Sequence, residues 1–139
     1  MPSSYRYIIA IVVAWLIANL IKICLLAIKT KHLNLLPGPG NMPSGHSAIV
    51  VSILTMIGMT EGITSTMFGL ALAVAVIIMY DATHVRLATG KQAEVIDKII
   101  KKAKLDIKPP KIVRGHTYAE VLVGAMIGFL VSYIVFITT

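Results

Sequence analysis

Hydrophobic residues gather in four stretches along the chain, separated by polar segments. The stretches cover residues 7–28, about 47–60, about 64–80, and 121–139. In the first, only Asn19 and Lys22 interrupt the apolar run, and a helix of this length crosses a hydrocarbon core of about 30 Å. The fourth contains no charged residue. The pattern therefore predicts an all-α protein whose helices cross a membrane.

The second and third stretches are short for membrane spans. Glu61 and Gly62 lie between them, which indicates a tight turn between two antiparallel helices. Short spans are accommodated by local thinning of the bilayer or by packing within a bundle. The first stretch is too long for the apolar part of a cleaved signal peptide, and no clear small-residue cleavage site follows it. We therefore expect about four transmembrane helices.

A long polar segment, residues 81–114, separates the third and fourth stretches. Within it, residues 94–108 place apolar side chains at helical spacing, and lysines cover much of the remaining surface. The apolar positions are Val95, Ile96, Ile99, Ile100 and Ala103. This pattern is typical of an amphipathic helix lying on a membrane surface, and Pro109-Pro110 is expected to end it. The expected fold is one domain over residues 1–139, a small polytopic helix bundle with one such surface helix.

The composition favours a lipid environment. Hydrophobic residues make up 57% of the chain and charged residues 14%, whereas soluble domains carry roughly 25% charge. The net charge is +7, but the basic residues lie between apolar stretches, which favours anionic lipid head groups over nucleic acid as a partner. If the chain crosses the membrane four times, segments 29–42 and 81–116 lie on the same side. These two segments contain 11 of the 13 basic residues. The positive-inside rule predicts that this side is cytoplasmic.

The first candidate site lies where the second apolar stretch begins, at Pro43-Ser44-Gly45-His46. Ser44 is suited to cap the helix. The free N–H groups and positive dipole end of a helix N-terminus favour a phosphate oxyanion, and His46 can donate a proton there. The alternative is a capped helix start with an incidental histidine, and this tetrapeptide alone does not decide between the two.

The second candidate site opens the fourth stretch. His116 and Glu120 are four residues apart, so in a helix they share a face, where the carboxylate would fix the tautomer of the imidazole. Thr117 and Glu120 also fit a capping box, in which the Glu120 side chain reaches back to the backbone of Thr117. The segment supports the two interpretations equally.

Cations provide further candidates on, or toward, the same side. Lys22 lies within a predicted span, where a lysine costs at least about 2.5 kcal/mol at the centre and therefore suggests a function. It shares a helix face with Lys29, and the alternative for Lys22 is snorkelling toward the nearby membrane surface. Asp81, Arg86 and Lys91 follow the third stretch, either as interfacial anchors or, for the two cations, as donors to phosphate.

Together these motifs resemble the signatures of the phosphatidic-acid-phosphatase type 2 (PAP2) superfamily. The stretch Pro-Ser-Gly-His at 43–46 is similar to the second signature. His116-x-x-x-Glu120 resembles the third, which usually ends in aspartate, and Lys22 with Lys29 resembles the first. The three motifs in this order are far more specific than any one of them.

Nearly the full chain resembles the short divergent branch of this superfamily, once called acid phosphatase/vanadium-dependent haloperoxidase related. The characteristic stretches of the branch correspond here to residues 41–46, 80–86 and 115–121. Asn41 stands in the place of a glycine in the first of them.

The chain departs from these patterns at several places. Pro110 stands where the third signature has an arginine, and Thr30 follows Lys29 where the first signature has a proline. His84 and Leu87 stand where the divergent branch usually has a glycine and a second arginine. Losing a bidentate guanidinium is not a conservative change.

The resemblance implies a phosphatase mechanism. His116 would attack a phosphoryl group to form a phosphohistidine, Glu120 would orient His116, and His46 would protonate the leaving oxygen. Cations and the start of a helix would hold the phosphoryl oxygens. Phosphoryl transfer needs positioning, electrostatic stabilisation and acid–base help, and these residues would provide all three. The implied phosphate-binding residues are Lys22, Lys29, Arg86, Lys91, Arg114, Ser44 and Gly45. The mechanism requires no metal or cofactor, and the sequence shows no cluster of metal ligands.

Three functions remain open at this point. The first is a phosphatase that acts on a lipid phosphate or diphosphate presented at the basic side of the membrane. The second is a catalytically weak or inactive head-group binder or scaffold of the same fold, which the departures favour. The third is a subunit that packs against other membrane proteins or copies of itself through Gly124-x-x-x-Gly128, although these glycines also suit packing within the chain.

Overall fold

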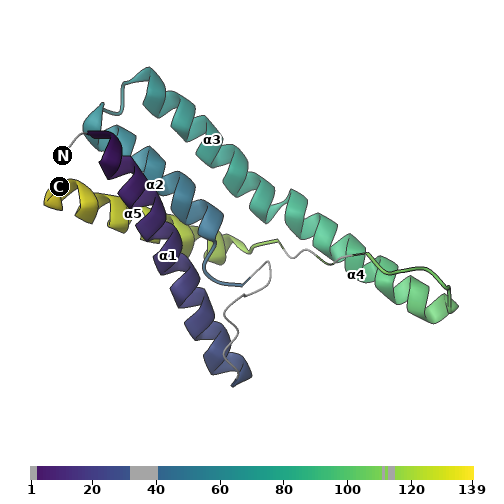
Figure 1. Cartoon of the computed structure of the whole chain (residues 1–139). Coiled ribbons are helices and arrows are strands. Elements are labelled where there is room, and N and C mark those ends of the chain that lie inside the picture. Colours follow the sequence, from purple (N-terminus) through teal and green to yellow (C-terminus); the bar gives the residue numbers. More distant parts are fainter. Residues whose placement is uncertain (1–2, 32–40, 111, 113–114) are drawn as a thin grey trace.

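The computed structural model describes residues 3–31, 41–110, 112 and 115–139, and it is helical without strands over these residues. The helices, in chain order, are α1 (Ser3–Thr30), α2 (Gly45–Thr60), α3 (Thr66–Thr83), α4 (Val85–Ala103) and α5 (Tyr118–Thr138). Figure 1 shows α1, α2, α3 and α5 gathered side by side, with the start of α1 close to the end of α5. The prediction of an all-α helix bundle is confirmed.

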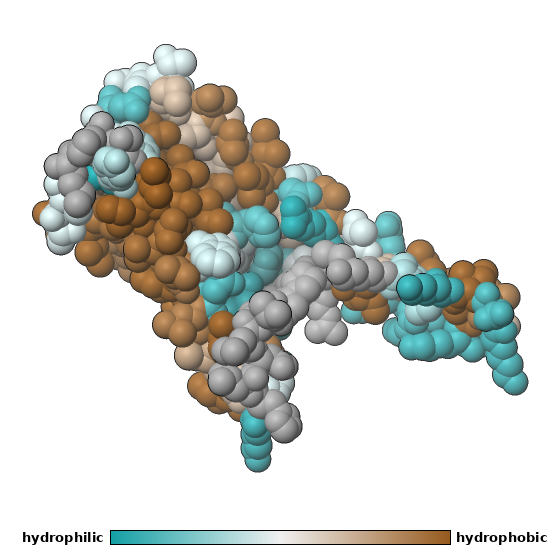
Figure 2. Space-filling view, in the orientation of Figure 1, coloured by the Kyte–Doolittle hydropathy of each residue, from teal (hydrophilic) through white to brown (hydrophobic). Residues whose placement is uncertain are grey.

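Among the described residues, three helical runs are long and apolar enough to cross a membrane. They are Tyr5–Thr30, Thr66–Ala103, which contains both α3 and α4, and Tyr118–Thr138. The fourth expected span, α2, is a shorter apolar helix of 16 residues, and it packs against α1, α3 and α5. Figure 2 shows hydrophobic side chains over the bundle and hydrophilic ones along α4. The arrangement is that of a small membrane helix bundle with a short central helix.

Caps and a tight turn set where the helices begin. The Ser44 side chain accepts a hydrogen bond from the Ser47 N–H at the start of α2, as predicted, and Ser65 does the same for Phe68 at the start of α3. Between α2 and α3, Gly62 has a φ of 87°, in the left-handed region that glycine adopts without steric cost. The predicted turn between antiparallel helices is therefore present.

Small residues at intervals of four bring α2 and α5 into backbone contact. A Cβ atom placed on Gly124 or on Gly128 would lie only 2.3 Å from a backbone oxygen of α2. The α2 oxygens concerned are those of Ser44 and Ala48. One turn further along, the Ser132 hydroxyl donates a 2.9 Å hydrogen bond to the Ser52 carbonyl. The Gly124-x-x-x-Gly128 motif thus packs α5 against α2 within the chain. Packing within the chain was the alternative that the sequence offered to packing against another protein.

Helix α1 covers the bundle with a stripe of small residues. Ala10, Ala14 and Ala18 have no exposed surface and belong to one core cluster with residues of α2 and α5. Lys22 is the next residue in this series and is 8% exposed. The helix face that packs α1 onto the bundle therefore carries a lysine at the end where α2 and α5 begin.

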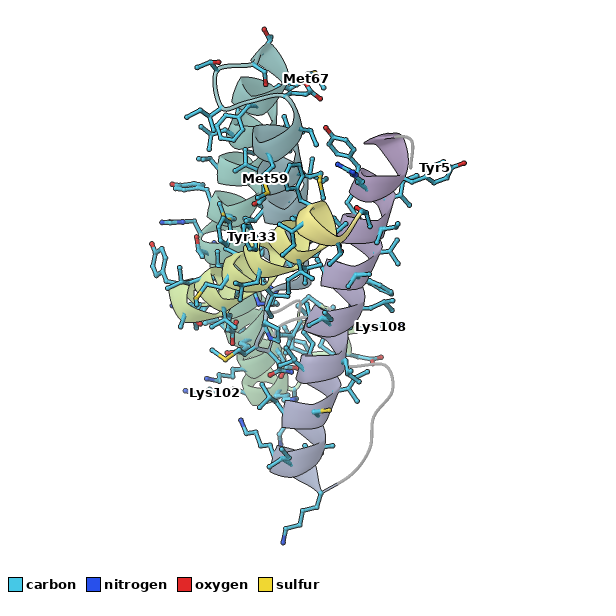
Figure 3. All side chains as sticks on the ribbon, turned by 90° about the vertical axis from the view of Figure 1, so that its left-hand side faces the viewer. Tyr5, Met59, Met67, Lys102, Lys108 and Tyr133 are labelled. Atoms are coloured by element: carbon cyan, nitrogen blue, oxygen red, sulfur yellow. The ribbon has the colours of Figure 1, made fainter. Side chains whose placement is uncertain are left out.

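Helix α4 differs from the amphipathic helix predicted over residues 94–108. It begins at Val85, directly after α3, because helical hydrogen bonds continue through His84. It ends at Ala103, before the two prolines, because Lys104 adopts a left-handed conformation with a φ of 51°. In Figure 1 it prolongs α3 beyond the bundle, and in Figure 3 Lys102 lies at the end opposite Tyr5 and Met67.

We predict that Gly128→Ala destabilises the protein. The added methyl group would clash with the backbone of α2, and overpacking of this kind costs about 1–3 kcal/mol. The measurement is thermal unfolding of the purified protein in detergent. Gly69→Ala is the matched control, since a Cβ at Gly69 meets nothing within 4 Å. Equal stability of the two variants would contradict the close contact between α2 and α5.

Candidate functional site

Backbone hydrogen bonds join three helix ends at the lysine-bearing end of the bundle. The His116 N–H, just before α5, donates to the Ala82 carbonyl near the end of α3, at 2.9 Å. The Ser44 N–H, at the start of α2, donates to the Glu120 carbonyl at 3.0 Å. The starts of α2 and α5 and the end of α3 therefore lie together.

Gly115 allows the segment before α5 to press against the start of α4. A Cβ on Gly115 would lie 2.3 Å from the backbone nitrogen of Leu87 and 2.8 Å from the carbonyl carbon of Arg86. This glycine belongs to the motif at 115–121, but we expected no structural role for it from the sequence. Its place directly before His116 means that the contact with α4 also sets the position of the histidine.

His116 is buried and forms a pair with Glu120. The distance between His116 Nδ1 and Glu120 Oε2 is 3.0 Å. The same carboxylate oxygen accepts the Thr117 N–H at 3.1 Å, and the Thr117 hydroxyl oxygen accepts the Glu120 N–H at 3.3 Å. The capping box and the imidazole–carboxylate pair, which the sequence offered as alternatives, are both present. With the Nδ1 proton directed at the carboxylate, the neutral ring keeps its lone pair on Nε2.

His46 is exposed in the first turn of α2 and lies among charges from the other helices. Arg86 and Lys22 act on it electrostatically as positive neighbours, Asp81 acts on it as a negative one, and His116 is a further ionisable neighbour. These groups come from α1, from the α3–α4 junction and from the start of α5. Four of the charged or ionisable groups singled out in the sequence therefore act electrostatically on His46.

Lys22 and Glu120 also line a pocket of about 210 Å³ beside α1. The other lining residues are Leu25, Leu26, Lys29, Asn41 and Met42. The Glu120 carboxylate acts electrostatically on Lys22. Asn41 has a φ of 70°, a conformation open to glycine and tolerated by asparagine. This fits an asparagine at a position where the motif that the sequence resembles has a glycine.

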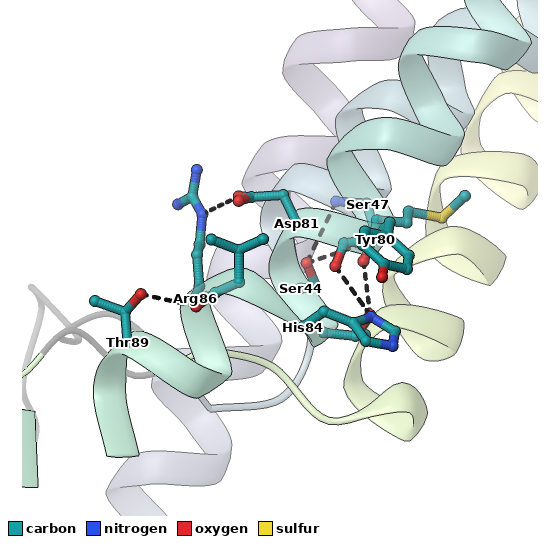
Figure 4. A network of polar contacts seen from close by, with 10 residues as sticks. Ser44, Ser47, Tyr80, Asp81, His84, Arg86 and Thr89 are labelled. Carbon is teal, nitrogen blue, oxygen red and sulfur yellow. Dashed lines mark hydrogen bonds and ion pairs between the residues drawn. The ribbon is translucent and has the colours of Figure 1, made fainter. Parts of the chain in front are cut away.

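A polar network covers the junction of α3 and α4, as Figure 4 shows. The Arg86 Nε donates to the Asp81 carboxylate in an ion pair. The His84 ring stacks on Tyr80, with ring centroids 4.0 Å apart, and its Nε2 lies 3.1 Å from the Tyr118 hydroxyl. We expected no site role for Tyr118 or His84 from the sequence, because their pairing depends on helices that are distant in sequence.

The remaining predicted phosphate-binding residues have other surroundings. Ser44 is buried, and its side chain accepts from Ser47. Gly45 is the first residue of α2 and is half-buried. Lys91 is exposed on α4, and no hydrogen bond or ion pair links it to other described residues. Arg114 lies outside the described residues. Within the described part of the chain, no group of three or more His, Cys, Asp and Glu residues could hold a metal ion.

These features define a small helical membrane protein with a histidine–carboxylate pair and a second histidine among cations at one end. Residues 3–131 match the divergent PAP2 family, and the chain belongs to this family, as predicted. It is similar to the uncharacterized membrane protein YuiD of Bacillus subtilis (strain 168), with 33% identity over 138 residues, covering 87% of each chain. No solved structure matches the chain. The chain is an integral membrane protein of this family.

We predict that Glu120→Ala releases the His116 ring from its fixed tautomer. The expected loss of stability is about 1 kcal/mol, because one half of the capping box is removed. Nitrogen-15 NMR of labelled histidine should show the Nδ1-protonated form of His116 in the parent protein and a mixture in the variant.

The matched control for this prediction is Thr117→Ala. It removes the other half of the capping box and should cost a similar amount of stability. It leaves the carboxylate in place, so the His116 tautomer should not change. If both variants left the tautomer as it is, Glu120 would have only a capping role.

Proposed function

We propose that this protein is a membrane-embedded, metal-independent phosphatase that hydrolyses a lipid phosphate or diphosphate through a phosphohistidine intermediate, with residues 1–139 acting as one domain. The observation that carries the proposal is the buried His116, paired with Glu120 at 3.0 Å. The start of α2, which carries His46, is hydrogen-bonded to the backbone of the same Glu120. A nucleophile needs an orienting group, and the departing oxygen needs a proton donor. Glu120 is the candidate for the orienting group, and His46 is the candidate for the proton donor.

In the first step of the proposed reaction, the Nε2 lone pair of His116 attacks the phosphorus atom. A P–N bond forms, the P–O bond to the lipid breaks, and the departing oxygen takes a proton from protonated His46. In the second step, His46 removes a proton from a water molecule, whose oxygen attacks the phosphorus. The P–N bond breaks, inorganic phosphate leaves, and both histidines return to their starting state.

Cations stabilise the phosphoryl oxygens in this proposal. Lys22 is 8% exposed, so its charge is less screened by water than that of a surface lysine. Arg86 is held by Asp81, which restricts its guanidinium near His46. Lys29 shares the pocket with Lys22. Lys91 and Arg114, with the helix start at Ser44 and Gly45, complete the proposed phosphate-binding set.

We further propose that the site opens on the cytoplasmic side. If the chain crosses the membrane four times, segments 29–42 and 81–116 lie on the side of this site, and they contain 11 of the 13 lysines and arginines. An excess of basic residues marks cytoplasmic loops. A lipid phosphate in the inner leaflet would therefore present its head group to His46 and His116.

A second candidate function is a head-group binder without catalysis. It is favoured by the ion pair between Arg86 and Asp81, because an arginine that is already paired offers less charge to a transition state. Pro110, in the place of the signature arginine, removes another cation. This candidate predicts binding of a lipid phosphate without turnover.

We predict that His116→Ala abolishes phosphate release from phosphatidate by the purified protein in mixed micelles. The parent protein, quenched during turnover with radiolabelled substrate, should carry an acid-labile phosphate on His116. The variant should carry none, because the attacking nitrogen is missing. A parent protein that binds phosphatidate but releases no phosphate would favour the second candidate.

The companion variant His46→Ala separates the two histidine roles. Without the proton donor, an alkyl phosphate should form the phosphoenzyme slowly, whereas an aryl phosphate with a stable leaving group should still label His116. Equal loss of labelling with both substrates would contradict the proton-donor role of His46.

A further inference from the structure

Helix α4 carries an apolar face that no other described helix covers. Val95 and Ile99 are 53% and 56% exposed, and they lie four residues apart on one helix face, with Ile96 at its edge. Gly90 and Ala93 are buried and lie roughly opposite, at about 100° of rotation per residue. Among the described helices, α4 contacts only α3. One side of α4 is therefore covered within the chain, and the apolar side is free.

Lysines line one edge of this free face. Lys98 and Lys102 are four residues apart and lie within about 60° of Val95 around the helix axis. Both are exposed, and no hydrogen bond or ion pair links them to other described residues. Lys101 differs, since it pairs with Asp97 at 2.7 Å on the other side of the helix. The edge of the apolar face thus offers two cations to a partner.

The continuous run of α3 and α4 is longer than a membrane core is thick. Residues Thr66–Ala103 form 38 residues of helix, about 57 Å at 1.5 Å per residue, against a core of about 30 Å. The 18 residues of α3 come close to spanning that core alone. Helix α4 therefore leaves the bundle at the end that holds the candidate site, as Figure 1 shows. In line with α3, its apolar face would meet water.

The junction between the two helices is the place where α4 can turn. His84 is both the C-cap of α3 and the N-cap of α4, and its φ and ψ depart from those of a regular helix. No side-chain hydrogen bond caps the start of α4. A bend at His84 would let α4 lie along the membrane surface beside the bundle.

The charge of α4 favours an anionic lipid surface over a second copy of the chain. The helix contains five basic and two acidic residues, so a second α4 on the same face would bring like charges together. An anionic leaflet fits both parts of the face. Apolar side chains enter the boundary between head groups and acyl chains, and lysines reach the negative head groups.

We propose that α4 bends at His84 and docks on the anionic leaflet beside the site, with Lys98 and Lys102 on lipid phosphates. In neutral lipid, α4 stays in line with α3. This dependence on lipid charge distinguishes α4 from a surface helix that is held by its apolar face alone. The lipid serves here as a docking surface and not as a substrate, so the inference is independent of the proposed function.

The test follows a fluorescent label on α4 of the intact chain in lipid vesicles. In a Cys24→Ser background, Ile99→Cys carries the label on the free face. With phosphatidylglycerol in the vesicles, brominated lipid should quench the label and aqueous acrylamide should not. With phosphatidylcholine alone, the two quenchers should exchange roles. A label at Lys101→Cys, on the other side of the helix, should stay open to acrylamide in both lipids.

Charge variants separate the lysines from the apolar face. Lys98→Glu with Lys102→Glu should lose the quenching by brominated lipid in phosphatidylglycerol vesicles. Lys98→Arg with Lys102→Arg should keep it, because the attraction depends on charge. Equal quenching by brominated lipid in both kinds of vesicle, or quenching that the glutamates leave unchanged, would overturn the inference.

Two further outcomes are decisive. Shielding of the Ile99 label that falls when the protein is diluted in lipid would indicate a second copy on this face and would also overturn the inference. None of these measurements depends on phosphate release. A protein that hydrolyses nothing but shows the lipid-dependent exchange of quenchers would support the docking of α4 and contradict only the proposed phosphatase.

Discussion

The close backbone contact between α2 and α5 is the constraint on which the rest of the structure depends. Inside a bilayer, apolar helices gain little by leaving lipid for one another, so close packing and hydrogen bonds must hold them together. Gly124 and Gly128 provide the close packing, and the bond from Ser132 to Ser52 provides the hydrogen bond. Because the contact starts at Ser44, the N-terminus of α2 is held beside the first turn of α5.

The candidate site follows from that contact. The start of α2 carries His46, and the start of α5 carries His116 and Glu120. The alanine stripe of α1 packs onto the same pair of helices, and its next member is Lys22, which therefore reaches the site as a consequence of packing. Gly115 brings the start of α4 close, and with it Arg86. Small residues that lie one to three helical turns from the site residues thus bring together residues that are distant in sequence.

Much of this arrangement could be predicted from the sequence, and the rest depended on contacts between distant segments. The apolar stretches and the cap at Ser44 are local patterns, so they predicted the helices, and the three motifs indicated the family. The extent of α4 was predicted less well, because the hydrogen bonds through His84 and the left-handed Lys104 are weakly encoded in local sequence. The role of Gly115 and the contact of His84 with Tyr118 were missed, since neither partner lies near the other in the chain.

The central proposal is that the imidazoles of His46 and His116 face one phosphate-sized space at one end of the bundle. Solid-state NMR can measure dipolar coupling between phosphorus-31 of a bound inorganic phosphate and nitrogen-15 in each histidine ring of the protein in lipid. We predict that the signals of both His46 and His116 are attenuated by the same phosphate. Coupling to neither ring, or to only one of them, would contradict it.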